Sequence, residues 1–125
     1  MNFHLLSPDI VETIHDDVLN LGELVGVALD KSLDGALARV EQRLAYGMIK
    51  DMFELAAAYG VVISTGHCFN DGNKRTAFRS MQVCLELHGM RLDFAAMETG
   101  QIIISAAQGF TDEAELANWL RAKTR

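Results

Sequence analysis

Apolar residues recur every three or four positions along almost the whole of this 125-residue chain. Such a spacing places side chains on one face of an α-helix, so it predicts a succession of amphipathic helices. The first apolar face comprises Ile10, Ile14, Val18 and Leu21. Ser7 and Pro8 precede it as a typical helix start, with serine as the N-cap and proline at the first helical position. The spacing therefore indicates an all-α chain.

Further helical segments follow a loop that glycines punctuate between residues 22 and 35. Their apolar positions are Leu33, Leu37, Val40 and Leu44; Met52, Phe53, Ala56 and Tyr59; Ala77, Phe78, Met81 and Leu85; and Leu116, Trp119 and Leu120. The second of these segments is apolar on several sides, which predicts a central helix. Thr111 is the expected N-cap of the last segment. The run 102–104 predicts either a strand or a buried helix, because a short apolar run fits both.

The length of the chain fits a single domain over residues 1–125. A chain of this size can bury a core, and it is too short for two ordinary domains. We find no internal repeat, low-complexity tract or linker in the sequence. Together with the helical spacing, these observations predict a compact single-domain helical bundle.

Composition and charge argue against several classes of protein. The chain has 11 basic residues against 17 acidic ones, a formal net charge of −6, which argues against a broad nucleic-acid-binding face. No apolar run approaches the roughly 20 residues of a membrane span, and the start lacks the basic and apolar segments of a signal peptide. Two cysteines are too few for a disulfide scaffold, so the reducing cytoplasm is the expected compartment.

The charge is unevenly distributed along the chain. Residues 1–36 hold seven acidic residues and one basic residue, whereas residues 67–79 hold three basic residues and one acidic residue. A cationic cluster in an acidic chain indicates a small anionic ligand held at one place, because the rest of the surface repels anions. A solvated charged turn is the alternative interpretation.

The residues with catalytic potential are concentrated in segment 67–79, whose sequence is HCFNDGNKRTAFR. We expect a polar loop that leads into the N-terminus of a helix, where unpaired N–H groups and the helix dipole favour an anion. Gly72 allows the backbone to approach a ligand closely, and Lys74 and Arg75 add positive charge. Phosphate fits such a site, and Asp71 is placed to hold the Mg²⁺ that accompanies a nucleotide.

His67 adds a base to this segment. An imidazole titrates near neutral pH, so His67 can accept a proton from a hydroxyl group. Phe69 is expected to anchor the loop in the core. A base, a metal ligand and an anion site within nine residues are the components of a phosphoryl-transfer site. A structural histidine followed by a simple Asn-Asp-Gly turn is the alternative.

The segment from His67 to Arg75 resembles the signature of the Fic/Doc family, H-x-F-x-(D/E)-G-N-x-R. A looser similarity to the compact Doc branch extends over residues 7–15, 39–46 and 51–59. The resemblance implies an all-α bundle, in agreement with the helical spacing. It also implies a toxin of a toxin–antitoxin module, since the Doc proteins are such toxins.

The resemblance implies a role for each matched residue. His67 would be the general base that activates a hydroxyl group of a protein target, and Asp71 would bind Mg²⁺. Gly72 and Asn73 would line the phosphate cradle for ATP, and Arg75 would neutralise phosphate oxygens. The resemblance therefore implies a transferase that depends on ATP and Mg²⁺.

Two departures from the AMP-transferring members of the family bear on the reaction. Those members carry glycine where this chain has Lys74, and arginine where it has Phe78. Arg79 lies one residue later, about 100° further around the helix, so we do not expect it to substitute. In the Doc branch this lysine accompanies a reversed nucleotide that presents its γ-phosphate. The implied reaction is phosphorylation of a protein hydroxyl, with elongation factor Tu as the family's target. AMP transfer and a non-catalytic antitoxin-binding module are the alternatives.

The sequence lacks the inhibitory helix that many AMP transferases of the family carry, whose pattern is (S/T)-x-x-x-E-(G/N). No glutamate in the chain is followed by glycine or asparagine. The resemblance therefore implies control by a partner, a Phd-type antitoxin. The acidic N-terminal region and the loop at residues 22–35 are candidate surfaces for an antitoxin or a target. A solvated acidic face is the alternative for the acids.

Two other chemistries remain open on sequence grounds. Cys84 and His88 are four residues apart, so they could bind zinc from one helix face. His67 and Cys68 would complete such a site, but adjacent residues are poorly spaced as ligands. Cys68 beside His67 could also act as a nucleophile, although sequence neighbours rarely face each other in an extended loop.

Overall fold

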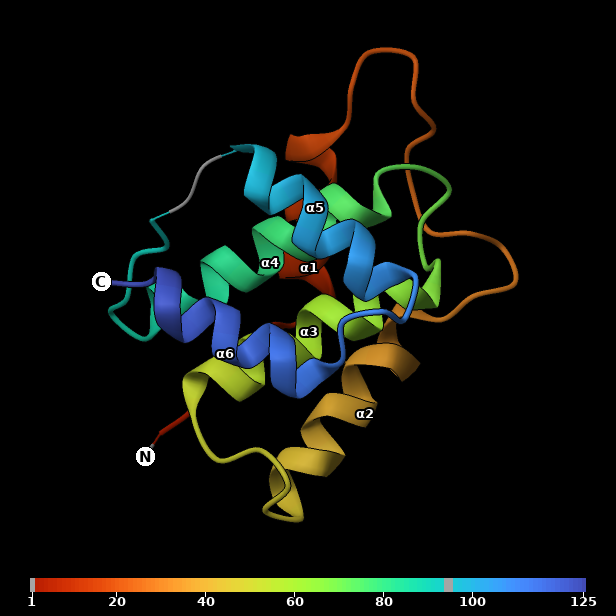
Figure 1. The fold of residues 1–125 in the computed structure, drawn as a ribbon. Helices are drawn as coiled ribbons and strands as arrows, with labels where there is room; N and C mark the ends of the chain where they lie inside the picture. The colour runs from red at the N-terminus through yellow and green to blue at the C-terminus, as the bar shows by residue number, and fades with distance from the viewer. Residues whose placement is uncertain (1, 94–95) are drawn as a thin grey trace.

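The computed structural model describes residues 2–93 and 96–125. Its helices, in chain order, are α1 (Pro8–Val18), α2 (Leu33–Ala45), α3 (Met52–Gly66), α4 (Asn73–Leu87), α5 (Ala96–Ala107) and α6 (Glu113–Lys123) (Figure 1). In the described part of the chain, β-structure is limited to two isolated bridges. The prediction of an all-α bundle is confirmed.

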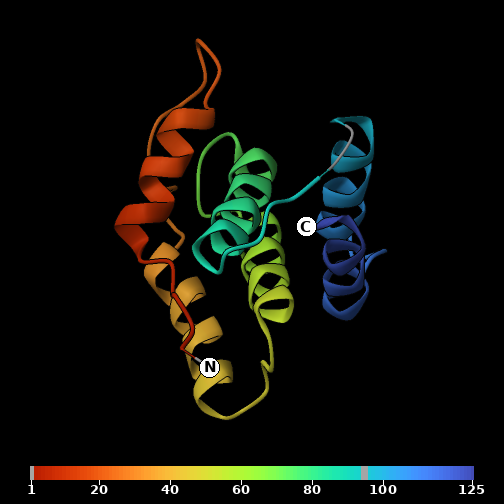
Figure 2. The same cartoon turned by 90° about the vertical axis from the view of Figure 1, so that its left-hand side faces the viewer.

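The helices form three layers, which Figure 2 shows side by side. Helices α3 and α4 form the middle layer, with α1 and α2 on one side and α5 and α6 on the other. Helix α3 is buried on several sides, as its apolar pattern predicts. A β-carbon at Gly60 on α3 would collide with the side chain of Met81 on α4, so the glycine allows the two central helices to approach closely.

Helix α1 differs from its predicted apolar face. Its buried residues are Val11, Ile14 and His15, whereas Ile10 is exposed. The helix ends at Val18, and Leu21 is fully exposed in the loop that follows. The backbone becomes extended at Leu19, because the chain leaves the helix there and runs towards the α3–α4 connection. The prediction was therefore wrong for Ile10 and Leu21.

In the C-terminal third of the chain, the structure decides between strand and helix for residues 102–104 and gives the last helix an N-cap other than the predicted one. Residues 102–104 lie within helix α5, with Ile103 buried and Ile104 exposed. The N-cap of α6 is Asp112, which forms a capping box with Glu115. Thr111, the predicted cap, is buried instead, and its hydroxyl lies 2.6 Å from the Ser105 hydroxyl. Aspartate accepts from the helix N–H groups at least as well as threonine does, so the helix begins one residue later.

None of the helices in the described ranges is long and apolar enough to cross a membrane.

Candidate active site

The segment 67–75 connects the two central helices at one end of the bundle (Figure 1). His67 ends α3 in the left-handed conformation, with φ 49°, and Gly72 precedes α4 with φ 76°. The left-handed turn at His67 separates it from the chain that follows, so His67 is exposed while Phe69 is buried. The loop is anchored by Phe69, as predicted, and the imidazole of His67 stays accessible to solvent.

The side chain of Asn73 closes the loop on itself. Its oxygen accepts a hydrogen bond from the N–H of Phe69 at 3.0 Å, and its amide donates to the carbonyl of Phe69 at 2.9 Å. The amide nitrogen has two N–H donors and uses one of them here, so Asn73 can still offer the other N–H, as well as its backbone N–H, to a phosphate. The structure thus gives the side chain of Asn73 a structural task that the sequence does not reveal.

The N-terminus of α4 lacks the side-chain cap that other helices of the bundle carry. Side chains of Ser7, Ser32, Asp51 and Asp112 cap α1, α2, α3 and α6, whereas Gly72 offers none to α4. The backbone N–H groups of residues 72–75 have no acceptor among the described residues. Several unpaired N–H groups at the positive end of a helix dipole form an anion-binding site.

Lys74 lies on the first turn of α4 and is exposed. Its ammonium group has no acidic partner in the described part of the chain, so it is available to an anion. A β-carbon at Gly72 would lie 3.3 Å from the Leu19 side chain, which explains why this left-handed position is occupied by glycine. Of these two features, the free ammonium group of Lys74 fits a bound phosphate group.

Asp71 is held at two points. Its carboxylate accepts from the N–H of Leu24 at 2.8 Å, and its carbonyl oxygen lies 2.6 Å from Nε2 of His15. The second carboxylate oxygen has no donor among the described residues. No group of three or more acidic, cysteine or histidine side chains that could hold a metal is found in the described ranges. A single carboxylate suits Mg²⁺, which is bound through one or two carboxylates together with substrate phosphates.

Arg75 is bound by the segment that follows α1. Its guanidinium donates to the carbonyl of Val18 at 2.7 Å and forms an ion pair with Glu23. The hydrogen bond with Glu23 raises the pKa of Arg75 and lowers the pKa of Glu23, so both groups are charged at neutral pH. Arg75 is therefore near the predicted anion site, but its guanidinium is occupied by a carboxylate of the same chain.

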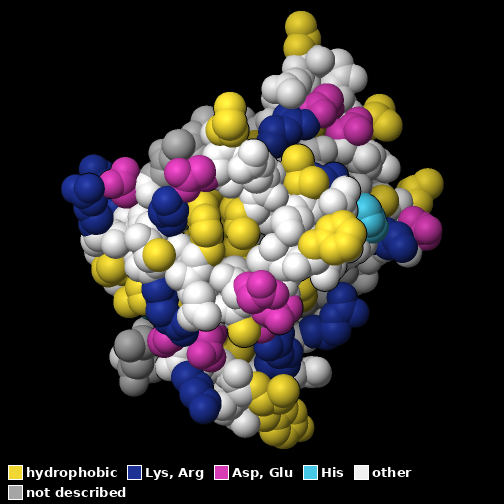
Figure 3. Space-filling model, viewed as in Figure 1, with side chains coloured by type: hydrophobic (Ala, Val, Ile, Leu, Met, Phe, Trp, Pro, Cys, Tyr) yellow, Lys and Arg dark blue, Asp and Glu magenta, His cyan; other side chains and the backbone are white. Residues whose placement is uncertain are grey.

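We call residues 19–32 the α1–α2 loop. It runs antiparallel to the signature segment: Val27 and Phe69 form a β-bridge, and the N–H of Ala28 donates to the carbonyl of Cys68 at 2.7 Å. Four of its large apolar side chains are exposed, namely Leu21, Leu24, Val25 and Leu29. Figure 3 shows hydrophobic side chains at both outer turns of this loop. An exposed apolar surface beside a candidate active site is typical of a protein interaction surface.

Three residues of the site are missed by sequence reasoning: His15, Glu23 and Leu24. All three are separated from their partners on the signature segment by 47 to 56 positions, which no local spacing can detect. The one available signal is His15 itself, a histidine placed beside Ile14 on the inner side of an amphipathic helix. A polar side chain in that position needs a partner, because an unpaired polar group is costly to bury.

The alternative chemistries are not supported by the geometry. Cys68 is 2% exposed, and burial raises the pKa of its thiol, which opposes formation of the nucleophilic thiolate. Cys84 and His88 lie at the C-terminal end of α4, about 20 Å from its start for a 15-residue helix. Both ring nitrogens of His88 contact backbone groups, at 2.7 Å and 3.1 Å. These residues do not form a zinc site with His67 and Cys68.

Arg79 points away from the signature segment. Its guanidinium donates to Gln82 at 2.8 Å and to Glu86 at 3.3 Å, both further towards the C-terminus of α4. Phe78, at the position where AMP-transferring members carry arginine, packs partly buried against the core. Within the described residues, Lys74 and Arg75 are therefore the two cations at the start of α4.

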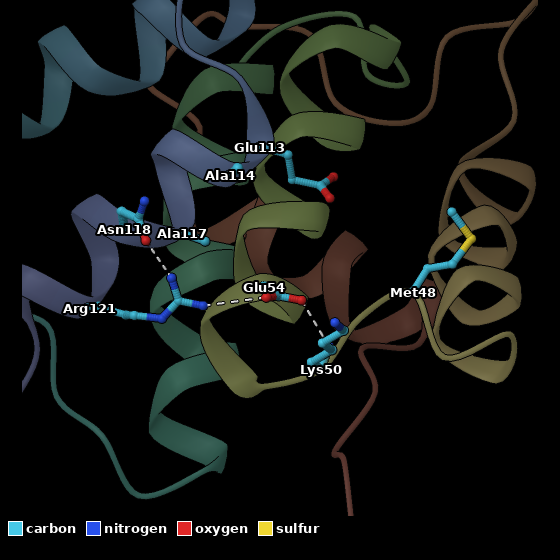
Figure 4. Close-up of a pocket in the computed structure, with 8 residues that line it drawn as sticks. All are labelled: Met48, Lys50, Glu54, Glu113, Ala114, Ala117, Asn118 and Arg121. Carbon is cyan, nitrogen blue, oxygen red and sulfur yellow. Dashed lines mark hydrogen bonds and ion pairs between the residues drawn. The ribbon is translucent and has the colours of Figure 1, made fainter.

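A pocket of about 350 Å³ lies at the opposite end of α3, between the start of that helix and α6 (Figure 4). Two of its charged residues, Arg121 and Glu54, are bonded to each other at 3.5 Å, and Glu113 is paired with Arg43 on α2. The length of α3, about 22 Å for 15 residues, separates this pocket from the signature segment. None of the residues from 67 to 75 lines it.

Comparisons with known proteins bear on the same segment. A protein-family model described as the Fic/DOC family matches residues 5–85. Among curated proteins, the chain is similar to "Protein kinase doc" of Escherichia phage P1. The two sequences are 34% identical over 117 residues, which cover 93% of this chain and 92% of the phage protein. The region matched by the family model contains the complete loop between α3 and α4.

Proposed function

This chain belongs to the Fic/DOC family, and we propose that it is a toxin that transfers the γ-phosphate of ATP to a hydroxyl group of a protein. The observation that carries the proposal is the uncapped N-terminus of α4, with its free N–H groups and the exposed Lys74, at the end of a loop that begins at the exposed His67. The name of the phage relative, a protein kinase, supports the same reaction class.

In the proposed reaction His67 acts as the general base. It accepts the proton of the target hydroxyl as the oxygen attacks the γ-phosphorus of ATP and ADP leaves. The N–H groups of residues 72–75 and the ammonium of Lys74 bind phosphate oxygens and stabilise the negative charge on them. The left-handed turn at His67 keeps the imidazole on the solvent side, where a protein target can reach it.

Asp71 is the residue that would hold Mg²⁺. Its fixed carbonyl and its single uncommitted carboxylate oxygen fit a metal that completes its coordination with phosphate oxygens and water. When bound, the ion would neutralise part of the phosphate charge. Arg75 can contribute to phosphate binding once its guanidinium is released from Glu23.

Lys74 supports phosphate transfer over AMP transfer. The proposed role gives a prediction: Lys74→Gly should lower the rate of phosphoryl transfer about ten- to a hundredfold, because a charge-assisted hydrogen bond contributes ~1.5–3 kcal/mol. The rate is measured from initial velocities with saturating target protein. Lys50→Gly is the matched control, since Lys50 is an exposed lysine at the far end of α3. An unchanged rate in Lys74→Gly would contradict the assigned role.

The direct test of the function is a mass measurement on the target. We propose elongation factor Tu as that target, so the purified chain is incubated with this factor, ATP and Mg²⁺, and the intact factor is weighed. We expect the mass of one phosphate, and no adduct when His67 is replaced. The much heavier AMP adduct would replace the proposed reaction by adenylylation. An unmodified factor would contradict this choice of target.

We also propose that a Phd-type antitoxin restrains the toxin and that the protein is cytoplasmic. The exposed apolar side chains of the α1–α2 loop lie beside the signature segment and offer a surface to an antitoxin or a target (Figure 3). A modified factor would no longer support translation. Co-expression of a Phd-type antitoxin should therefore restore growth to cells that the toxin arrests.

The Glu23–Arg75 ion pair leads to a further prediction. Arg75, a proposed phosphate ligand, is bound to a carboxylate of the same chain. We therefore expect Glu23→Gln to bind ATP about threefold more tightly. The expected effect is small because a partly exposed ion pair contributes little free energy. Isothermal titration with ATP and Mg²⁺ measures the change. The matched control is Glu86→Gln, which removes the ion pair with Arg79 on the same helix. Weaker binding in Glu23→Gln would show that Glu23 assists the nucleotide rather than competes with it.

A further inference from the structure

His15 is a buried histidine that the proposed reaction does not use. It lies on α1, is 1% exposed, and points towards the signature segment 56 residues further along the chain. Its Nε2 lies 2.6 Å from the carbonyl oxygen of Asp71. Since a carbonyl oxygen only accepts hydrogen bonds, Nε2 must carry the proton and act as the donor.

Two residues of the signature segment, Phe69 and Asp71, contact this side chain. The ring of His15 stacks on the ring of Phe69, with centroids 3.9 Å apart and planes at 9°. A ring carbon lies 3.7 Å from the place where a β-carbon of Gly72 would be. The imidazole therefore lies between α1 and the loop, where one ring makes both the stacking contact with Phe69 and the hydrogen bond to Asp71.

We propose that His15 is a positioning residue for the nucleotide site, which rests on the function proposed above. The peptide bond between Asp71 and Gly72 is planar and trans, so its carbonyl and its N–H point in opposite directions. The bond from His15 holds the carbonyl of Asp71 towards α1. It thereby holds the N–H of Gly72 away from α1, on the side where the free N–H groups of α4 begin.

The same contact also orients the side chain of Asp71. His15 fixes the main chain of this residue from one side, and the N–H of Leu24 binds its carboxylate from the other. Without His15 the carboxylate would have one anchor and the peptide plane could rotate. We therefore expect Mg²⁺ and the phosphate groups to lose a common, preorganised site, although His15 touches neither of them.

Three variants separate the hydrogen bond from the ring contact. His15→Phe keeps a flat ring against Phe69 and removes the donor, His15→Leu removes both, and His15→Gln keeps an N–H donor of similar reach. His88→Leu is the matched control. Like His15, His88 bonds to the backbone through its ring, in this case through both nitrogens, but it lies at the other end of α4.

The first measurement is hydrogen exchange of the free protein, which requires neither ATP nor a target. We expect the amides of residues 69–76 to exchange about tenfold faster in His15→Phe and His15→Leu, with little change in His15→Gln or in His88→Leu. Equal protection of this segment in wild type and His15→Phe would overturn the proposal, because the hydrogen bond would then hold nothing in place.

The second measurement is the affinity for ATP in the presence of Mg²⁺. We expect the dissociation constant to rise about ten- to a hundredfold in His15→Phe, as for other residues that support a metal ligand, and to recover within a few-fold in His15→Gln. Unchanged affinity in a folded His15→Phe protein would also overturn the proposal. Failure of the proposed function is recognised separately, because wild type would then neither bind ATP nor modify a target, while the exchange result would still report on the loop.

Discussion

Replacing His67 by alanine is expected to lower the rate of phosphoryl transfer at least a hundredfold, since general-base catalysis typically contributes about 10²–10⁴. ATP binding should persist, because the groups assigned to the phosphates begin five residues later, at Gly72. Initial velocities report the first effect, and isothermal titration with ATP and Mg²⁺ reports the second. A variant that keeps substantial activity would contradict the role of His67 as the base.

The backbone at His67 requires a second variant. Its φ of 49° is a left-handed conformation that disfavours alanine by about 1 kcal/mol or more but that asparagine adopts more readily. His67→Asn therefore removes the base with less disturbance of the turn. Both variants should be inactive; loss of activity in the alanine variant alone would assign the effect to the backbone.

Replacing Asp71 by asparagine is expected to abolish the effect of Mg²⁺ on ATP binding and to lower transfer about a hundredfold or more, because a bound metal supplies several kcal/mol of charge stabilisation. The amide oxygen of asparagine can still accept from the N–H of Leu24, so the contact with the α1–α2 loop is retained. The wild-type protein should bind ATP more tightly with Mg²⁺ than without it, and the variant should not distinguish the two conditions.

The control for Asp71 is an aspartate outside the site. Asp93 is exposed and forms an ion pair with Arg125 at 2.9 Å, so Asp93→Asn removes the same charge at a distance from the loop. It should retain both activity and the dependence on Mg²⁺. Full activity of Asp71→Asn without added metal would show that the carboxylate is not a metal ligand.

The helices are largely predictable because their causes are local. Apolar spacing and capping residues act over four positions, and they predict the central place of α3 and the start of α1, with Ser7 as its N-cap and Pro8 at its first position. The errors arise where local rules compete. Thr111 and Asp112 are both good caps, and Leu21 continues the apolar spacing of α1 although the chain has left the helix.

The site is predictable only in part, because only some of its contacts are local in the sequence. A contiguous signature contains His67, Asp71 and the start of α4, so their proximity follows from the sequence. What holds them there does not: His15, Glu23 and Leu24 approach from α1 and the loop after it. Such contacts depend on how whole helices pack, and neither periodicity nor spacing carries that information. The engagement of Asn73 with Phe69 is local, yet the residue type alone does not reveal it.

The absence of a side-chain cap on α4 links the thermal stability of this helix to its ability to bind a ligand. The caps at Ser7, Ser32, Asp51 and Asp112 each contribute about 1 kcal/mol relative to alanine, whereas α4 has an N-cap glycine without a side chain, Gly72. A capping side chain is opposed at Gly72 by its φ of 76° and by the Leu19 side chain, which would lie 3.3 Å from the added β-carbon. A selection for heat resistance would therefore have to rebuild this turn before it could add a cap. In a protein rebuilt in this way, the capping oxygen would take the N–H groups that are now open to a ligand. Laboratory evolution of this fold for robustness should thus be accompanied by a screen for toxicity, since the two properties draw on the same turn of helix.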